Sequence, residues 1–119
     1  MHSTHAFRRA LRKAQRTADD NANGLALLVF RIGTTNVDSE RVAQLVQVLS
    51  NRIRVTDEIG WLDGQRIGVL LRFTCLEGGK VVAGAIRGKL AAQNAVVRTR
   101  VFAYPDSWSQ SSSDAGGSL

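Results

Sequence analysis

Few side chains in this sequence could act in catalysis or hold a metal ion. His2 and His5 lie three residues apart near the N-terminus, where solvated side chains are expected rather than metal ligands. The single cysteine, Cys75, excludes an internal disulfide, fits a reducing compartment and is expected to be a small packed residue. The spacing of a zinc site and the Ser/His/Asp, P-loop and dinucleotide-binding patterns are missing. The sequence therefore predicts no catalytic residue, no metal ion and no cofactor.

The strongest local signal is GWLDGQRIGVLL, residues 60–71, in which two apolar runs flank Asp63-Gly64. This dipeptide is typical of a type I′ hairpin turn, whose two central residues both take positive φ. The stretch therefore predicts a strand, a tight turn and a second strand.

Length and composition indicate one globular domain. The chain has 119 residues, of which 44% are hydrophobic and 22% charged. No apolar run approaches the ~18 residues of a membrane span and no signal-peptide core is seen, so a cytoplasmic location is expected. The formal net charge of +6 is compatible with nucleic acid, anionic lipid or a phosphorylated ligand. Residues 107–119 are rich in Ser and Gly and are expected to form a disordered tail or linker.

The first expected element is a basic amphipathic helix, THAFRRALRKAQRTADD, residues 4–20, capped by Ser3 or Thr4. Apolar residues recur at helical spacing on one side, and basic residues fill the other. The pattern indicates either a solvated charged face on a docked helix or a surface for anionic lipid or nucleic acid. The apolar side holds Phe7, Ala10, Leu11, Ala14 and Ala18, and the basic side holds Arg8, Arg9, Arg12, Lys13 and Arg16.

The remaining elements follow in the order βαββαβ. LALLVFRI, residues 25–32, is apolar enough for a strand at the centre of a sheet. Thr74 and Glu77 have the spacing of a capping box at the start of a helix. The expected strands are residues 25–32, 52–62, 65–73 and 95–105, and the expected helices run from Asp38 or Ser39 to about Asn51 and from Thr74 to about Ala92.

This order predicts an α+β fold, a ferredoxin-like four-stranded antiparallel sheet with an extra N-terminal helix, over residues 1–106. An RNA-recognition domain has the same order but stacks bases on aromatic residues of its central strands. Here the third strand offers Ile67, Val69 and Leu71, and Phe30 stands alone in the first strand. A basic nucleic-acid-binding domain therefore remains an alternative, restricted to sequence-independent phosphate contacts.

Several stretches together resemble the GGDEF family, the diguanylate cyclases and their degenerate relatives. AFRRALRKAQRTADDNANGLALLVFRI is similar to the family's opening helix and first strand. RVTDEIGWLDGQRIGVLL is similar to its R-x-x-D motif, five-residue spacer, GGDEF signature and apolar strand, and AAQNAVVRTRVFAY to a later strand. The resemblance rests on the order and register of these stretches, over roughly residues 5–104, and implies a nucleotide cyclase-like fold.

In active members, acidic residues of the signature and an Asp at the end of the first strand hold two Mg²⁺ ions against a triphosphate. In this sequence Gln65 and Arg66 replace the acidic pair, and Arg31 replaces the first-strand Asp. The resemblance therefore implies a domain whose metal-binding carboxylates are lost and which is not an enzyme. The signature positions hold Asp63, Gly64, Gln65, Arg66 and Ile67.

The resemblance also implies a ligand site. In the family, an R-x-x-D placed five residues before the signature forms an inhibitory site for cyclic di-GMP, and Arg54 and Asp57 keep that spacing. Arg can hold a phosphate or guanine edge with two hydrogen bonds, and Asp can accept from guanine N–H groups. The same two residues can also be explained without a ligand, as an exposed surface ion pair that contributes ~0–1 kcal/mol to stability.

The expected function is that of a catalytically inactive regulatory or interaction domain, with cyclic di-GMP reception at the R-x-x-D pair as an alternative. A protein partner or self-association is expected, and the basic helix allows peripheral membrane contact. Residues 56–71 and the T-x-L-E-G helix start also resemble segments attached to bacterial polyprenyl-phosphate sugar transferases of exopolysaccharide synthesis. That likeness implies the cytoplasmic part of such an enzyme or of a signalling protein.

Overall fold

Within the residues that the structure describes, seven elements follow one another, a helix and then a βαββαβ unit. The structure, a computed structural model, describes residues 1–21, 24–32, 39–93 and 97–104. The order of elements matches the sequence-based expectation. The helices are α1 (Thr4–Asn21), α2 (Ser39–Arg52) and α3 (Leu76–Ala92), and the strands are β1 (Leu25–Arg31), β2 (Glu58–Trp61), β3 (Arg66–Arg72) and β4 (Arg98–Tyr104).

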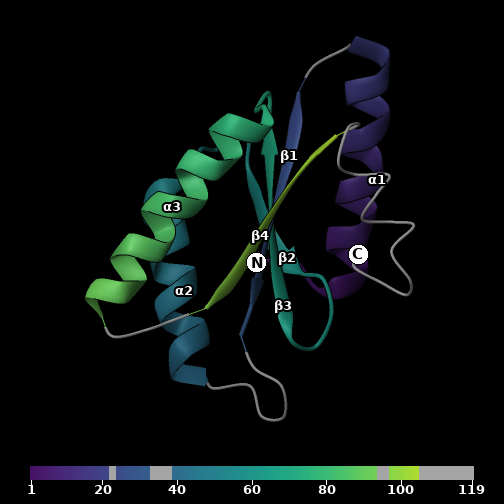
Figure 1. Ribbon diagram of the computed structural model, residues 1–119. Helices are drawn as coiled ribbons and strands as arrows, with labels where there is room; N and C mark the ends of the chain where they lie inside the picture. Colours follow the sequence, from purple (N-terminus) through teal and green to yellow (C-terminus); the bar gives the residue numbers. More distant parts are fainter. Residues whose placement is uncertain (22–23, 33–38, 94–96, 105–119) are drawn as a thin grey trace.

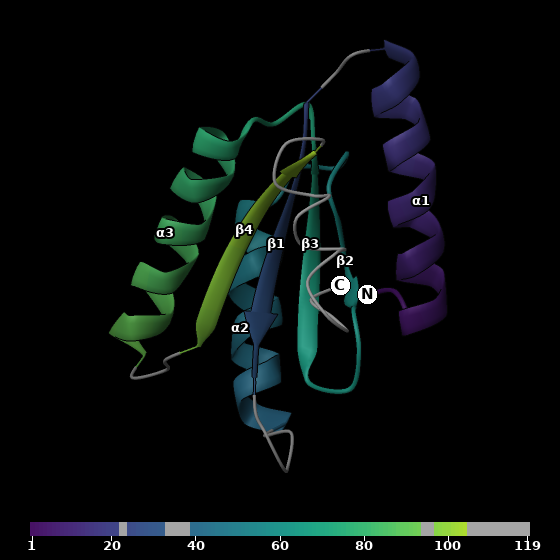
Figure 2. The same ribbon diagram turned by 45° about the vertical axis from the view of Figure 1, so that its right-hand side comes forward.

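The four strands form one antiparallel sheet in the order β2-β3-β1-β4, which is visible in Figure 2. The two central strands, β1 and β3, are the two most apolar ones, because a central strand with both faces covered has no side exposed to water. The ferredoxin-like α+β fold predicted from the sequence is confirmed.

Helices cover both faces of the sheet. Figure 1 shows α2 and α3 on one face and α1 on the other. Side chains alternate along β1, so Leu28 and Phe30 pack against α2 and α3 while Leu27 and Val29 pack on the α1 side. The buried apolar residues accordingly form two clusters, one in each layer.

Helix α1 is docked through Phe7, which is fully buried over two glycines. Gly60 of β2 pairs with Gly68 of β3, and a Cβ added at either residue would lie 2.5 or 2.6 Å from Phe7 side-chain atoms. The two glycines therefore form the seat for the aromatic ring. The apolar face of α1 is turned to the sheet and its basic face to solvent, as the helical pattern predicts.

The two outer strands of the sheet differ in how their edges are covered. His2 lies beside β2: its N–H donates to the Ile59 carbonyl (2.9 Å), and the Trp61 N–H donates to the His2 carbonyl (3.2 Å). Within the described ranges, no strand pairs with the outer edge of β4.

Local capping agrees with the sequence at α1 and differs at α3. Ser3 caps α1, since its Oγ accepts from the Ala6 N–H (3.2 Å). The capping box predicted at Thr74 is wrong, because the Thr74 hydroxyl donates to the Arg72 carbonyl (3.0 Å). Cys75 is the N-cap instead, and its Sγ accepts from the Gly78 N–H (3.4 Å).

Cys75 is exposed, so the expectation of a packed cysteine is also wrong. In the described part of the chain, no helix is long and apolar enough to cross a membrane. The predicted cap at Asp38, the strand stop at Pro105, the domain boundary at 106 and the tail 107–119 lie outside the described residues.

Candidate functional site

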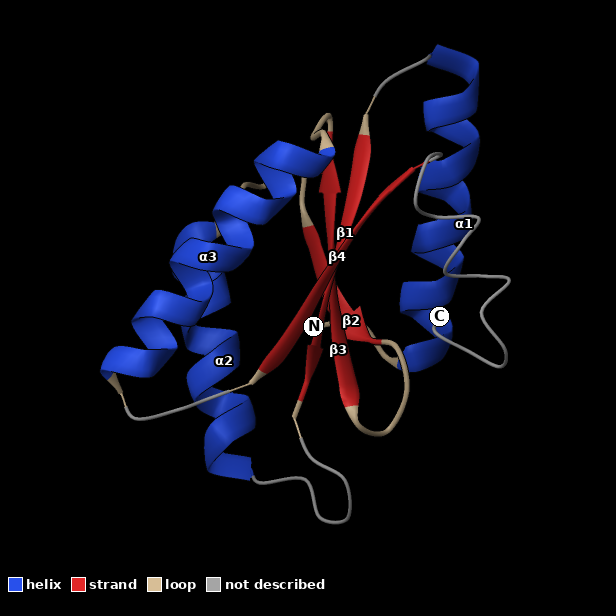
Figure 3. Cartoon of the chain, viewed as in Figure 1, coloured by secondary structure: helices blue, strands red, loops and turns tan. Residues whose placement is uncertain are grey.

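The turn between β2 and β3 is built by the carboxylate of Asp63. Oδ1 of Asp63 accepts from the backbone N–H groups of Gln65 (2.8 Å) and Arg66 (2.9 Å). The type I′ prediction is wrong, because neither Asp63 nor Gly64 has positive φ. The side-chain hydrogen bonds of an Asx-type turn shape this connection, drawn in tan in Figure 3.

The same carboxylate is paired with Arg66. Nε of Arg66 donates to Oδ2 of Asp63 at 2.7 Å, so both carboxylate oxygens have donors within the hairpin. Burial alone would raise the pKa of Asp63, but the hydrogen bonds from Gln65 and Arg66 outweigh it and lower that pKa. Asp63 is thus held ionised by groups of the turn itself.

Arg31, at the end of β1, lies next to this turn. Its Cα is paired with that of Arg66, and its Nη2 donates to Oε1 of Gln65 at 3.2 Å. The three residues predicted to replace metal-binding carboxylates are therefore brought together at one end of the sheet. The guanidinium groups of Arg31 and Arg66 repel a divalent cation, and the one nearby carboxylate, that of Asp63, is already paired with Arg66. No group of three His, Cys, Asp or Glu side chains that could hold a metal ion is found in the described residues.

Arg54 and Asp57 are also in contact, between α2 and β2. The Arg54 backbone N–H and Nε donate to Oδ2 of Asp57 (2.8 and 3.2 Å), and Nη2 donates to Oδ1 (3.1 Å). Nη2 of Arg54 also donates to the carbonyl of Arg72 (2.8 Å), which ties this loop to the end of β3. Asp57 is the one buried charged residue in the described part of the chain. This pair therefore has a structural role, and its only exposed member is Arg54.

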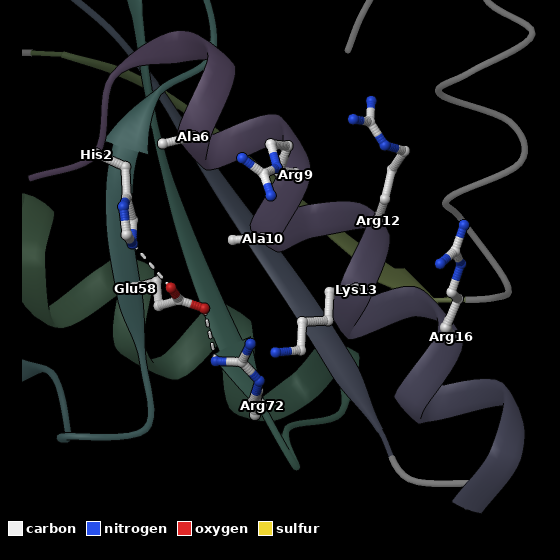
Figure 4. A pocket seen from close by; sticks show the side chains of 9 residues that line it. All are labelled: His2, Ala6, Arg9, Ala10, Arg12, Lys13, Arg16, Glu58 and Arg72. Carbon is white, nitrogen blue, oxygen red and sulfur yellow. Dashed lines mark hydrogen bonds and ion pairs between the residues drawn. The ribbon is translucent and has the colours of Figure 1, made fainter.

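A basic groove with a volume of about 680 Å³ runs along one side of α1, beside β2 and β3. Figure 4 shows cations of α1 on one wall and Arg72 with Glu58 on the other, with Lys13 directed across the groove. The α1 cations follow the spacing i, i+3, i+4 and i+7, and their side chains have no ion-pair partner among the described residues. They are Arg9, Arg12, Lys13 and Arg16.

The opposite wall is a hydrogen-bonded network around Glu58. Its carboxylate pairs with Arg72 Nη1 (2.7 Å) and with His2 Nε2 (2.8 Å). Burial alone would raise the pKa of Glu58, but the hydrogen bonds from Arg72 and His2 outweigh it and lower that pKa. Sequence reasoning missed this wall, because His2 joins it only when the N-terminus lies along β2.

The terminal turns of α1 lack the charged side chains that would stabilise its helix dipole. Its first turn holds no acidic residue and its last turn no basic residue, whereas the helix dipole favours the opposite arrangement. Cations at i, i+3 and i+4 also repel one another. The basic stripe therefore costs helix stability.

Comparison with known protein structures identifies the fold of this chain. No protein-family model and no curated protein sequence matches the chain. Similar solved structures include a DGC protein from Thermotoga maritima, with a TM-score of 0.76 and 13% identity over 89% of this chain and 83% of that chain. The GGDEF domain of DgcB from Caulobacter crescentus, in complex with c-di-GMP, gives a TM-score of 0.71 and 11% identity over 87% and 69%.

A third similar structure is the diguanylate cyclase SiaD in complex with its activator SiaC, from Pseudomonas aeruginosa. It gives a TM-score of 0.71 and 14% identity over 95% of this chain and 51% of that chain. The chain thus has the fold of GGDEF domains, as the sequence resemblance implied.

Proposed function

We propose that this chain is a catalytically inactive GGDEF-like domain that acts as a regulatory and interaction module. One observation carries the proposal: Arg31, Gln65 and Arg66 meet at the end of the sheet where the resemblance places metal-binding carboxylates. Phosphoryl transfer from a triphosphate needs divalent ions to neutralise charge on the phosphate oxygens. Cations at these positions oppose such ions, and Asp63 is already paired with Arg66.

Binding of Mn²⁺, followed by its electron paramagnetic resonance signal, tests this charge reversal. We expect no saturable Mn²⁺ site in the protein, and a gain of binding in the Arg31→Asp/Arg66→Glu variant, which serves as the positive control. A Mn²⁺ site in the unaltered protein that disappears in Asp63→Asn contradicts the proposal.

The interaction surface that we propose is the basic groove beside α1, with an acidic segment of a protein as its partner. The four α1 cations, which have no ion-pair partner among the described residues, supply the charge. The groove between helix and sheet suits a linear chain better than a flat membrane. The apolar face of α1 is buried against the sheet, so insertion into a bilayer is not available to it. SiaD, with the same fold, was solved with a protein activator. Self-association of two copies is a separate proposal, and sedimentation as a monomer at micromolar concentration contradicts it.

A second candidate function is cyclic di-GMP binding at Arg54. The Arg54 side chain is 54% exposed, whereas that of Asp57 is 2% exposed, so contacts to a ligand would come from the guanidinium. The DgcB domain in complex with c-di-GMP supports testing this ligand. Calorimetry with cyclic di-GMP should show heat of binding in the unaltered protein and none in Arg54→Lys. This substitution keeps the positive charge but removes the planar guanidinium group that can donate two parallel hydrogen bonds. Equal binding by both proteins, or no heat, removes this candidate.

We further propose that the domain serves as the cytoplasmic regulatory part of a bacterial exopolysaccharide sugar transferase or signalling protein. The support is the sequence resemblance of residues 56–71 and of the T-x-L-E-G segment.

A further inference from the structure

Three arginines stand side by side in neighbouring strands at one end of the sheet. In the strand register, Arg31 of β1 faces Arg66 of β3 on one side and Arg98 of β4 on the other. Side chains alternate along a strand, so all three belong to the face that carries α1. The N–H of Ile32 donates to the carbonyl of Gln65 (2.9 Å), so the adjacent Arg31–Arg66 pair is the narrow type, in which side chains approach most closely.

This row costs the sheet stability. Like charges directly opposite each other on neighbouring strands repel. Asp63 compensates Arg66, but the hydrogen-bond partner of Arg31 is the uncharged amide of Gln65. Arg98 is exposed and has no ion-pair partner among the described residues. Among the described residues, no carboxylate pairs with Arg31 or Arg98, so nothing there compensates the charge of these two side chains.

The row lines a cavity of about 480 Å³. Arg87 of α3 and Arg100 of β4 line it as well, so cations from four elements converge on one space. Val29 and Phe102 add an apolar wall, and the Arg100 guanidinium lies 5.6 Å from the centre of the Phe102 ring. The lining residues that the structure describes include no acid. The volume is within the range of small-molecule sites, roughly 300–1,000 Å³.

We propose that this arginine cavity, formed by Arg31, Arg66, Arg87, Arg98 and Arg100, binds a compact anion with two or more phosphate groups, without a divalent cation. Guanidinium groups hold phosphate oxygens with paired hydrogen bonds and remain charged at any physiological pH. Several of them supply the countercharge that a metal ion would otherwise supply. The proposal goes beyond the proposed function and does not depend on it, since it concerns a ligand rather than turnover or the α1 groove.

Calorimetry with inorganic pyrophosphate, ATP and AMP, in EDTA and again with Mg²⁺, tests the cavity. We expect pyrophosphate to bind in EDTA, and AMP to bind at least roughly tenfold more weakly, because one phosphate engages fewer guanidinium groups. Arg31→Ala/Arg98→Ala should weaken pyrophosphate binding roughly tenfold or more. The matched control, Arg52→Ala/Lys89→Ala, removes the same charge from exposed positions outside both basic sites and should change the affinity less than roughly twofold.

Both double variants are checked for folding by thermal unfolding, and Arg98→Gln/Arg100→Gln is the substitute if the first one fails to fold. If ATP binds with the same affinity as pyrophosphate, the cavity contacts the phosphates alone. If ATP binds more tightly, the cavity also contacts the nucleoside. Both results support the proposal. Absence of binding at millimolar pyrophosphate and ATP overturns the proposal. So does a requirement for Mg²⁺, or an equal loss of affinity in the control variant.

Discussion

At the scale of single residues, the buried charge of Asp57 is the one whose loss of hydrogen-bond partners should destabilise the fold most. Its carboxylate is buried and receives three hydrogen bonds, all from Arg54. Arg54→Ala removes two of these and leaves the carboxylate short of donors. We expect a loss of about 2–3 kcal/mol in the free energy of unfolding, measured in urea. The exposed control Arg16→Ala should change it by less than about 0.5 kcal/mol. Equal, small effects of both substitutions would show that Asp57 needs no partner.

Glu58 predicts a dependence of stability on pH. Its pKa is lower in the folded chain than the usual value of 4.5, so the ionised form stabilises the fold above that pH. This contribution is lost as the pH falls below 4.5 through the folded-state pKa. We therefore expect Glu58→Gln to lower the melting temperature at neutral pH, and the difference from the unaltered protein to shrink in acid. Thermal unfolding followed by circular dichroism measures it; a difference that grows in acid contradicts the assignment.

At the scale of elements, the docking of α1 depends on two glycines that leave room for Phe7. A methyl group at Gly68 would meet the Phe7 ring at 2.6 Å, whereas one at Gly64 would meet no atom within 4 Å. Gly68→Ala should therefore cost about 1–3 kcal/mol of unfolding free energy. Gly64→Ala, the matched control, should be neutral or stabilise by up to about 1 kcal/mol. If urea unfolding finds the two variants alike, α1 is not held in this way.

The order of the elements was predictable because each strand or helix carries its own hydrophobic pattern. β1 was recognisable as a central strand from its unbroken apolar run, and α1 from its apolar stripe. Two local details were not predictable, for one physical reason. The carboxylate of Asp63 accepts hydrogen bonds from N–H groups of the turn, and the hydroxyl of Thr74 donates to the carbonyl of Arg72. Neither hydrogen-bond partner follows from residue type alone.

The sites depend on contacts between distant parts of the chain. Arg31 and Arg66 were singled out by resemblance to a family, but Arg98 joins them only through the register of β1 with β4. Likewise, His2 and Glu58 meet only because the N-terminus runs beside β2. The hydrophobic periodicity within a segment gives no information about either of these contacts.

At the scale of the whole molecule, positive charge is collected in two separate places, the α1 groove and the arginine cavity. We expect a labelled ten-residue oligoglutamate peptide to bind the groove, with an affinity that falls as salt is added. Arg9→Ala/Lys13→Ala should weaken it by roughly three- to tenfold, since each exposed pair contributes up to ~1 kcal/mol. Arg98→Ala/Arg100→Ala, which changes the other surface, should have a smaller effect. Fluorescence anisotropy measures both.

Two results would contradict the assignment of the groove to an acidic protein segment. One is an equal loss of peptide affinity in both double variants, which indicates a response to net charge alone. The other is tighter binding of a single-stranded RNA of ten nucleotides, or of vesicles with a third of anionic lipid, than of the peptide.

We propose that this GGDEF-like domain has no cyclase activity, because Arg31 and Arg66 stand where the resemblance places the carboxylates that hold metal ions. Incubation of the protein with GTP and Mg²⁺, and separately with Mn²⁺, followed by chromatography of the nucleotides, tests it most directly. We expect no cyclic di-GMP above a blank without protein. Cyclic di-GMP that increases with protein concentration and is abolished by Asp63→Asn would contradict it.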